Sequence, residues 1–553
     1  MSGPNPIQQL MKGTFVLALA AFLSKLLGVI YKIPYQNITQ DMGFYVYEQV
    51  YPIYMILLTL ATAGVPVAIS KLVAERLAFQ DHAGARKVFK AAALLLTLTG
   101  FLFFSALFLG APLVAAILYD PQLTLAIQSV SFALLVVPVM AAIRGYFQGH
   151  QNMVPTAVSQ VVEQIVRVAT IIWLSYWLIS NQYDAYHAGA GAVFGAFTGA
   201  VAALVVLLIY WRKNKKSEVA ATVEQPASEA GDMVPSYQAV GYWTIIRKIV
   251  AYAVPISLGA LVLPLFQLMD SLTIPHMLTL SGWEHELAKN ERGVYARGHP
   301  LVQFAAFFAT ALSLALVPSI SEAKAQNKVR QIVSRTQVAL KVTFLVGLGA
   351  AVGLAVLARP INVMFYITDA GSTTISVLAF VTIFSTLSMT SGAVLQGMGY
   401  VTLPARHLFI GVGVKSILNI ALLPFFGITG AALASVVGYF TAASLNIRTL
   451  RRMLPLPRIT GQAVSRPAVA VLIMGAVVWM VKGSLFVALD GLIGHERLLN
   501  LAVTLLSIPV GVFVYALFLL RFNMITRQEL AILPRGERLI MLLEKLKIIR
   551  KER

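Results

Sequence analysis

The sequence predicts an all-α integral membrane protein with about fourteen transmembrane helices. The chain has 553 residues, of which 58% are hydrophobic and 12% are charged. Apolar stretches of about 20 residues, the length that crosses a bilayer, recur along almost the whole chain. A soluble protein could not bury this much apolar surface around one core. The absence of cysteine from the sequence excludes disulfides and cysteine-based metal sites or nucleophiles.

The expected spans follow one another along the chain. The first has no small-residue cleavage site behind a short apolar run, and further spans follow it. We therefore expect a span there and not a removable signal peptide. In chain order, the apolar stretches lie near residues 12–34, 44–68, 91–118, 122–146, 155–180, 189–211, 247–275, 299–320, 341–367, 373–397, 404–425, 428–447, 467–488 and 499–520.

The charge of the loops predicts the orientation of the chain. A net charge of +20 is compatible with nucleic-acid binding, but lysine and arginine are distributed as the positive-inside rule requires. Short or acidic loops alternate with basic ones, apart from an outer loop of mixed charge from His276 to His299. Both termini are therefore expected in the cytoplasm. The basic segments are Lys71 to Lys90, Arg212 to Lys216, Lys324 to Arg335, Arg448 to Arg458 and the tail after Arg521.

The chain contains an internal repeat. The segment GAVFGAFTGAVAALVVLLIYWRKNKK, from Gly191, aligns without a gap with GAALASVVGYFTAASLNIRTLRR, from Gly430. Two parallel repeats of about six helices each are expected, with the substrate site between two halves that rock about it. The predicted divisions are an N-terminal lobe (1–213), a cytoplasmic linker (214–246), a C-terminal lobe (247–455), two further helices (456–522) and a basic cytoplasmic tail (523–553) lying on anionic membrane lipids.

Several motifs have ordinary structural explanations. The glycines Gly191, Gly195 and Gly199 are spaced four apart, as in a small-residue face for helix packing. His285 beside Glu286 does not form an HExxH motif, and there is no Walker loop. No Ser/His/Asp or paired-carboxylate set is available for catalysis. We therefore expect neither an enzyme nor a metal site.

Two lysines occupy the first expected span, in the segment FLSKLLGVIYKIP. Lys25 lies roughly 17 Å from Thr14 at about 1.5 Å per helical residue, which is near the bilayer middle. Lys32 is one heptad further on and falls on nearly the same helix face. Charged groups at such depth face a cavity or a partner. The alternatives are a carboxylate partner on another helix for Lys25 and an outer headgroup for a snorkelling Lys32.

Charged residues also lie within later spans. Glu163 and Arg167 are four residues apart and are expected to form a self-contained structural pair on one helix face. Lys415, with Asn419 one turn further on, requires a partner elsewhere in the chain. Asp270, in the seventh span, is the candidate partner.

The remaining interior charge is mostly basic. Lys25, Lys32 and Arg297 outnumber the unpaired acids, whereas Arg144 lies near a span end and is interpreted as an anchor. A cation-lined cavity between two rocking halves suits an anionic substrate. Ammonium and guanidinium groups bind phosphate oxygens strongly, so phosphate or pyrophosphate is the expected group.

The doubled plan resembles the MOP exporter superfamily, and within it the MurJ-type lipid II flippases and the stage V sporulation protein B-like polysaccharide exporters. The segment SKLLGVIYK resembles the family's first-span motif Ser-Arg-x-Leu-Gly-x-x-Arg. Lys25 stands at its first arginine and Tyr31 at its second, with Lys32 one residue late. The segment VYARGHPL resembles Tyr-Ala-x-Arg before the eighth span, with Arg297 one residue early.

The resemblance implies a substrate and a transport cycle. The substrate would be lipid II, the undecaprenyl-pyrophosphate-linked peptidoglycan precursor, turned from the inner to the outer leaflet of the bacterial cell membrane by alternating access. Cavity cations, joined by Tyr31, would hold the pyrophosphate, and the last two spans would guide the lipid tail. No bound cofactor is implied. Some relatives couple to sodium near positions that Asp270 and Asn419 occupy here, and Lys415 is expected to act as a tethered cation in its place.

Two other functions stay open at this point. Export of another lipid-linked polysaccharide unit would use the same fold, the same pyrophosphate and the same cations. A multidrug exporter of the superfamily would require unpaired acids in its cavity, which the basic interior disfavours. One doubled chain can enclose the cavity, so we expect a monomer that acts on a lipid-linked pyrophosphoryl glycan and binds no nucleic acid.

Overall fold

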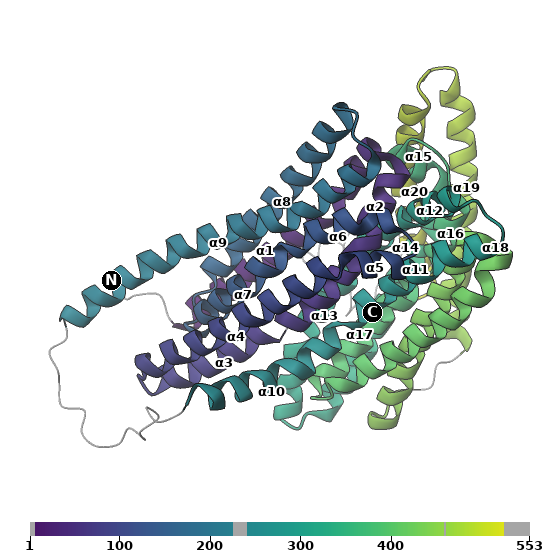
Figure 1. Cartoon of the computed structure of the whole chain (residues 1–553). Coiled ribbons are helices and arrows are strands. Elements are labelled where there is room, and N and C mark those ends of the chain that lie inside the picture. The colour runs from purple at the N-terminus through teal and green to yellow at the C-terminus, as the bar shows by residue number, and fades with distance from the viewer. Residues whose placement is uncertain (1–5, 63, 225–240, 458–460, 525–553) are drawn as a thin grey trace. The chain divides into compact units, whose positions relative to one another are not determined.

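In the computed structural model of the chain, every regular element among the described residues is a helix (Figure 1). The structure describes residues 6–62, 64–224, 241–457 and 461–524. The predicted linker between residues 225 and 240 and the predicted tail from residue 525 lie outside the described residues. The all-α fold class is confirmed.

The helices belong to two compact units, residues 1–296 and residues 297–553. Packing defines these units, whereas a repeated sequence defines the predicted lobes, so the predicted lobe boundaries stay a prediction. Unit 1 contains α1 (Pro6–Ile30), α2 (Lys32–Thr62), α3 (Val65–Ala78), α4 (His82–Leu109), α5 (Ala111–Ile117), the short 3-10 helix η1 (Pro121–Leu123), α6 (Thr124–Ser131), α7 (Ala133–Gly149), α8 (Val154–Ser180), α9 (Ala185–Glu224), α10 (Tyr242–Ala260), α11 (Val262–Leu280) and α12 (His285–Ala296).

Unit 2 is built from the remaining helices. They are α13 (Gly298–Ala325), α14 (Val329–Val356), α15 (Ala358–Tyr366), α16 (Ser372–Leu378), α17 (Val381–Gly397), α18 (Thr402–Met453), α19 (Gly461–Asp490) and α20 (Glu496–Arg521).

The number of helical stretches that could cross a membrane is lower than the expected number of spans. Among the described residues, 10 helical stretches are long and apolar enough to cross a membrane, or up to 11 if one bent pair counts as a span. The expected count of about fourteen is not confirmed. Two of the stretches, Leu19–Ala78 and Thr402–Met453, contain 60 and 52 residues, more than twice the roughly 20 that one crossing needs. Both contain a reversal of the chain.

Helix α2 reverses direction at Gln40, which has φ 57° and ψ −170°. Lys32 and Glu48 are 16 residues apart in sequence, yet their side chains contact each other. A straight helix would separate them by about 24 Å. The Tyr35 hydroxyl donates to the Gly43 carbonyl at 2.8 Å and closes the turn.

Helix α18 reverses in the same way at Gly427, which has φ 55° and ψ −145°. His407 Nδ1 lies 2.7 Å from Asn446 Oδ1, 39 residues later, which a straight helix would place about 58 Å away. Glycine tolerates this positive φ because it has no Cβ. Each reversal brings two antiparallel helix segments together.

The predicted outer loop from His276 to His299 is largely helical. Helix α11 continues to Leu280, and α12 begins at His285. The mixed charges of α12 conceal one buried face, which recurs at the three- to four-residue spacing of a helix. This face carries Ala288, Lys289, Arg292, Gly293 and Ala296, and the adjacent Val294 and Tyr295 are buried as well.

The glycine stripe on α9 packs against α8, and Figure 1 shows the two long helices side by side. A Cβ added at Gly195 would lie 3.0 Å from the Arg167 carbonyl oxygen, and one at Gly199 would lie 2.6 Å from that of Glu163. The predicted packing face is confirmed. The close approach fixes the backbone of α8 at the two residues whose side chains form a charged cluster.

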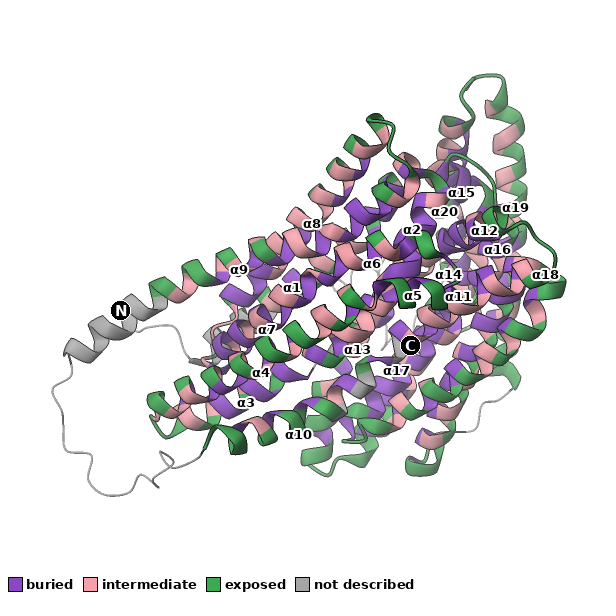
Figure 2. Ribbon diagram, viewed as in Figure 1, coloured by how far each residue is buried: buried purple, intermediate pink, exposed green. Residues whose placement is uncertain are grey.

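Buried and exposed residues lie on different faces of the helices (Figure 2). On α8, for example, Trp173 and Tyr176 are exposed, whereas Ile171 and Ser175 are buried. Large apolar side chains on the outside of a helical protein suit a lipid environment. Polar and charged side chains in such a protein are expected inside the bundle.

Candidate functional site

The predicted site residues are divided between the two units. Those in unit 1 lie on α1, α2, α8 and α11, or directly between α1 and α2. Unit 1 holds Lys25, Tyr31, Lys32, Glu163, Arg167 and Asp270, and unit 2 holds Arg297, Lys415 and Asn419.

Lys32 forms a buried ion pair with Glu48. Its Nζ lies 2.5 Å from Glu48 Oε1, and the two side chains are 7% and 3% exposed. Beside this pair, the Tyr31 and Tyr47 hydroxyls share a hydrogen bond of 2.5 Å. The pair explains how a lysine is accommodated here. Sequence reasoning missed Glu48, although a single acid inside an apolar span is the signal that could have identified it.

Arg144, Glu163 and Arg167 form a second charged cluster, called here the arginine triad. Glu163 accepts a hydrogen bond from each arginine at 2.9 Å, one on each carboxylate oxygen. Arg144 also donates to Ser159 Oγ at 2.9 Å. The predicted pair of Glu163 and Arg167 is present. It is not self-contained, and the interpretation of Arg144 as an anchor was wrong, because Arg144 reaches from α7 to the same carboxylate.

Four tyrosines lie between the two charged clusters and are called here the tyrosine ladder: Tyr31, Tyr47, Tyr51 and Tyr54. The Tyr47 and Tyr51 rings stack with centroids 5.2 Å apart, and the Tyr51 and Tyr54 centroids are 5.9 Å apart. The spacing of three to four residues places the last three on one face of α2. Arg167 is within electrostatic range of these three tyrosines.

Lys25 is exposed on α1. Three residues later, Gly28 packs against α8, where an added Cβ would lie 3.3 Å from Gln164 Nε2. Lys25 is therefore on a helix that contacts α8 next to Glu163. The helix that carries Lys25 therefore packs beside the helix that carries Glu163 and Arg167.

Asp270 is buried on α11, where it is 1% exposed. Its Oδ2 accepts a hydrogen bond of 3.4 Å from the Tyr295 hydroxyl of α12. Nearby, Gln49 Nε2 donates to the Ser271 carbonyl at 2.6 Å. These contacts hold α11 and α12 against α2 around the acid that the sequence singled out.

The buried face of α12 also carries a lysine that sequence reasoning missed. Lys289 Nζ lies 3.3 Å from Asp120 Oδ1 and 2.8 Å from Glu286 Oε1. Asp120 Oδ2 accepts hydrogen bonds from the Tyr45 hydroxyl at 2.9 Å and the Tyr186 hydroxyl at 2.8 Å. Asp120 lies in one of the short or acidic loops that the charge distribution predicts. An acid followed by Pro121 at a helix start signals a cap, not a buried ion pair, so the sequence did not reveal this role.

Arg292, one turn further along α12, is 0% exposed. Its Nη2 lies 3.5 Å from the Glu48 carbonyl oxygen, and its guanidinium carbon lies 5.7 Å from the Tyr295 ring centroid. The neighbouring Gly293 is closely packed against α2, since an added Cβ would lie 2.0 Å from the Asp41 carbonyl oxygen. Helix α12 therefore packs directly on the reversal of α2.

Arg297, in unit 2, is 1% exposed. It donates through Nη1 to Thr368 Oγ1 at 2.9 Å and to the Ala370 carbonyl at 3.4 Å. The Tyr366 hydroxyl donates in turn to the Arg297 carbonyl at 3.1 Å. These contacts tie Arg297 to the connection between α15 and α16.

Lys415 and Asn419 lie one turn apart on α18, as the sequence predicted. They are 3% and 0% exposed, so both are inside unit 2. Among the described residues, no group of three or more His, Asp or Glu side chains is placed to hold a metal ion.

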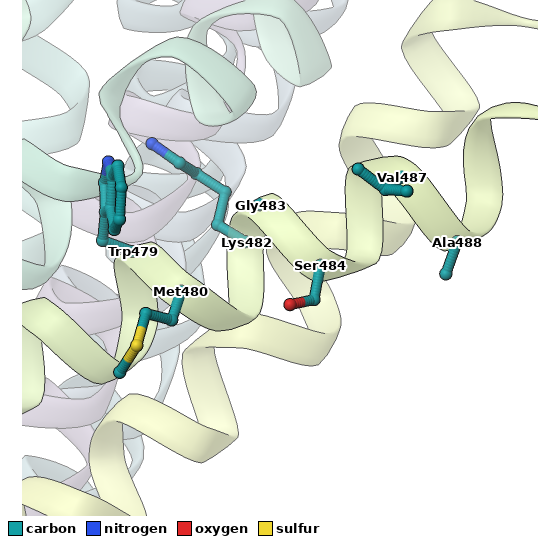
Figure 3. Close-up of a pocket in the computed structure, with 7 residues that line it drawn as sticks. All are labelled: Trp479, Met480, Lys482, Gly483, Ser484, Val487 and Ala488. Atoms are coloured by element: carbon teal, nitrogen blue, oxygen red, sulfur yellow. The ribbon is translucent and has the colours of Figure 1, made fainter.

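A separate hollow of about 750 Å³ lies along α19. Figure 3 shows its lining, in which Trp479 and Lys482 stand beside apolar side chains. Lys482 Nζ donates to the Val356 carbonyl at 3.1 Å. None of the predicted site residues lines this hollow.

Comparison with known proteins identifies the family. The profile of the family described as "Polysaccharide biosynthesis protein" matches residues 10–324, and that of the family described as "MatE" matches residues 277–421. The chain is 34% identical over 528 residues to "Uncharacterized membrane protein YabM" of Bacillus subtilis (strain 168), covering 96% of this chain and 95% of that protein. It is 30% identical over 466 residues to "Lipid II flippase MurJ" of the same organism, covering 80% and 83%. It is 27% identical over 542 residues to "Stage V sporulation protein B" of that organism, covering 97% and 99%.

Solved structures share the fold. The inward closed conformation of lipid II flippase MurJ matches with a TM-score of 0.63 at 13% identity, covering 91% of this chain and 98% of that one. An inward-facing multidrug resistance MATE family transporter of the MOP superfamily matches with a TM-score of 0.62 at 15% identity, covering 78% and 94%. At these identities the likeness concerns the fold alone.

Proposed function

The chain belongs to the polysaccharide biosynthesis protein family of flippase-like MOP superfamily members, and from this premise we propose that it is a lipid II flippase. It would turn the undecaprenyl-pyrophosphate-linked peptidoglycan precursor from the inner to the outer leaflet of the bacterial cell membrane. The identity with the relative named lipid II flippase supports this substrate. We further propose that both termini are cytoplasmic, that the chain works as a monomer and that its basic tail contacts anionic lipids.

The position of Lys25 is the observation that carries the proposal. Its side chain is exposed on α1, inside a helical stretch long and apolar enough to span the membrane. A lysine facing lipid at this depth is costly, whereas one facing a water-filled cavity is not. A cation at a cavity wall suits the pyrophosphate of a lipid-linked precursor.

Lys32, Tyr31 and Arg297 are proposed to complete the substrate site. Glu48 holds the Lys32 ammonium in the described state, so a bound pyrophosphate would compete with this carboxylate. Tyr31 would orient the pair through its bond to Tyr47. Arg297 would bind the substrate, and its hydrogen bonds to the α15–α16 connection would transmit this binding to that part of unit 2.

Asp270, Lys415 and Asn419 are proposed to couple the cycle to an ion or to the membrane potential. The acid is buried in one unit, and the lysine and asparagine are buried in the other. The Lys415 ammonium would serve as a tethered cation in place of a bound ion and make sodium unnecessary. Transport measured with sodium replaced by choline tests this: an unchanged rate is expected, and a strict sodium requirement would overturn it.

Another lipid-linked polysaccharide unit is the alternative substrate. The family description and the similarity to stage V sporulation protein B over 97% of the chain favour this second candidate. A multidrug substrate is less favoured, because such substrates are often cationic, whereas unit 1 carries Lys32 and the arginine triad in its interior and Lys25 on α1.

Native mass spectrometry of the purified chain distinguishes these substrates. Lipid II and an undecaprenyl-pyrophosphate carrying a different glycan are offered together. Preferential retention of lipid II is expected, with loss of retention in Lys25→Ala. Preferential retention of the other lipid-linked glycan would identify that glycan, and not lipid II, as the substrate. Retention of neither compound would overturn the proposed pyrophosphate-binding site.

A further inference from the structure

The arginine triad carries one more positive than negative charge. Among the described residues, Glu163 is the only acid within ion-pair distance of Arg144 or Arg167. The side chains of Arg144, Glu163 and Arg167 are 13%, 14% and 13% exposed, so most of each is removed from water. Surplus charge in such surroundings is unfavourable unless a further group compensates it.

Two donors beside the triad lack a partner. Arg167 Nε and the Tyr54 hydroxyl are buried, and neither has a hydrogen-bond partner among the described residues. Tyr54 is within electrostatic range of both Arg167 and Glu163. Buried donors without acceptors are uncommon in native proteins and indicate a missing acceptor. The surplus charge and the unused donors both require an anionic, oxygen-rich group.

The triad is separated from the Lys32–Glu48 pair along unit 1. Arg144 precedes the end of α7, at Gly149, by roughly 7.5 Å of helix, and Glu163 follows the start of α8, at Val154, by roughly 13.5 Å. The Lys32–Glu48 pair instead flanks the reversal at Gln40. The tyrosine ladder connects the two clusters: Tyr31 is within electrostatic range of Glu48 and Arg167, and Tyr54 is within range of Arg167 and Glu163.

We propose that Arg144, Arg167 and the Tyr54 hydroxyl form a second pyrophosphate-binding site, at the opposite end of the tyrosine ladder from Lys32. The inference rests on the proposed function, because it assigns the triad to the same chemical group of the substrate. Guanidinium groups bind phosphate oxygens through paired hydrogen bonds. Glu163 orients both arginines and competes with the bound group, which keeps binding weak enough for release toward the next site.

The Tyr54 hydroxyl provides the sharpest test, because among the described residues it has no hydrogen-bond partner to lose. The full-length chain is purified in detergent, and inorganic pyrophosphate is titrated by calorimetry. Tyr54→Phe is expected to weaken binding about tenfold, the effect of one hydrogen bond to a charged acceptor, without lowering the melting temperature. Tyr515→Phe is the matched control. Its hydroxyl donates to the Leu345 carbonyl at 2.9 Å, so it should lower the melting temperature and leave pyrophosphate binding unchanged.

Substitutions of the charged residues distinguish a binding role of the triad from a structural one, because they are expected to change the pyrophosphate affinity in opposite directions. Arg144→Gln and Arg167→Gln are expected to weaken pyrophosphate binding at least tenfold, whereas Glu163→Gln should strengthen it. Arg76→Gln is the control, because Arg76 is 13% exposed and pairs with Asp81 at 3.3 Å. If each substitution lowered stability but left pyrophosphate bound as tightly as in wild type, or if wild type itself bound no pyrophosphate, the proposal would be overturned.

Comparison with farnesyl pyrophosphate identifies the source of the anion. Tighter binding than inorganic pyrophosphate, lost in Tyr54→Phe, indicates a lipid-linked group, and equal or weaker binding indicates a soluble one. Export is measured separately in cells. Export of lipid II by a chain whose triad binds no pyrophosphate overturns this inference alone. Pyrophosphate bound at the triad of a chain that exports no lipid-linked glycan overturns the proposed function alone.

Discussion

Glu48 gives Lys32 a partner inside the protein, and this pair accounts for one of the two lysines in the first apolar stretch. With side chains 7% and 3% exposed and an N–O distance of 2.5 Å, the pair is almost completely withdrawn from solvent. A buried pair contributes little compared with apolar residues of the same shape, but removing one partner leaves an uncompensated charge. Lys32 therefore depends on an acid, either Glu48 or a substrate phosphate.

The variant Glu48→Gln should lower the free energy of unfolding by about 3–5 kcal/mol, because it strands the Lys32 ammonium. Thermal unfolding of the purified protein in detergent measures the effect. Glu75→Gln is the control: its partner Lys71 is 4.0 Å away, both side chains are about half exposed, and a change below about 1 kcal/mol is expected. Equal effects of the two substitutions would show that Lys32 does not depend on Glu48.

The backbone at Gln40 is a second residue-scale feature. A φ of 57° with a ψ of −170° lies in a region that costs a non-glycine residue about 1–3 kcal/mol. Gln40→Gly should raise the melting temperature, because relief of this strain exceeds the roughly 0.5–1 kcal/mol of added chain entropy. Gly427→Ala, at the equivalent reversal of α18, should lower it. If both substitutions lower the melting temperature, the backbone strain at Gln40 does not outweigh the chain entropy that glycine adds.

At the residue scale, the sequence predicted charged residues better than their partners. The pairing of Glu163 with Arg167 followed from their spacing of four on one helix. Arg144, Glu48 and Asp120 could not be paired from the sequence, because their partners are 16 or more residues away and come from other helix segments. The buried partner of Lys289 was hidden for the same reason: Asp120 lies in a distant loop, whereas Glu286 is three residues away on α12.

At the scale of elements, α12 shows how packing overrides a loop-like composition. Its polar sequence suggested an outer loop, yet small and basic residues form a buried face that meets α2. Only the tertiary contacts with α2 and with Asp120 make this face visible, because the charged residues on it mask its hydrophobic period. The glycine stripe of α9 was easier to predict, since small residues at a spacing of four have few other uses in a span.

Substitution of Gly293 tests the contact between α12 and α2. Gly293→Ala places a Cβ 2.0 Å from the Asp41 carbonyl oxygen, so the helices must separate, at a cost of about 1–3 kcal/mol in the free energy of unfolding. Gly413→Ala is the matched control, because an added Cβ there meets nothing within 4 Å. It should be neutral or stabilising by up to about 1 kcal/mol. A stable Gly293→Ala variant would contradict the packing of α12 described here.

For the whole molecule, composition was sufficient for the fold class, and motifs in the first and eighth expected spans were sufficient for the family. The number of spans is not confirmed: 10 or up to 11 stretches qualify among the described residues, although two of them reverse, at Gln40 and Gly427, between segments that the sequence predicted as separate spans. The predicted lobes follow a repeated sequence. The units follow packing, which places α10, α11 and α12 with the first part of the chain.

The central claim is that cations inside the membrane-spanning bundle receive the pyrophosphate of lipid II. The most direct measurement is the amount of lipid II exposed on the outer leaflet of cells depleted of their own flippase and expressing this chain. Wild type should restore exposure, and Lys25→Ala and Arg297→Ala should not, although both reach the membrane in normal amounts. A wild-type chain that is abundant in the membrane and restores no exposure, or variants as active as wild type, would contradict the account.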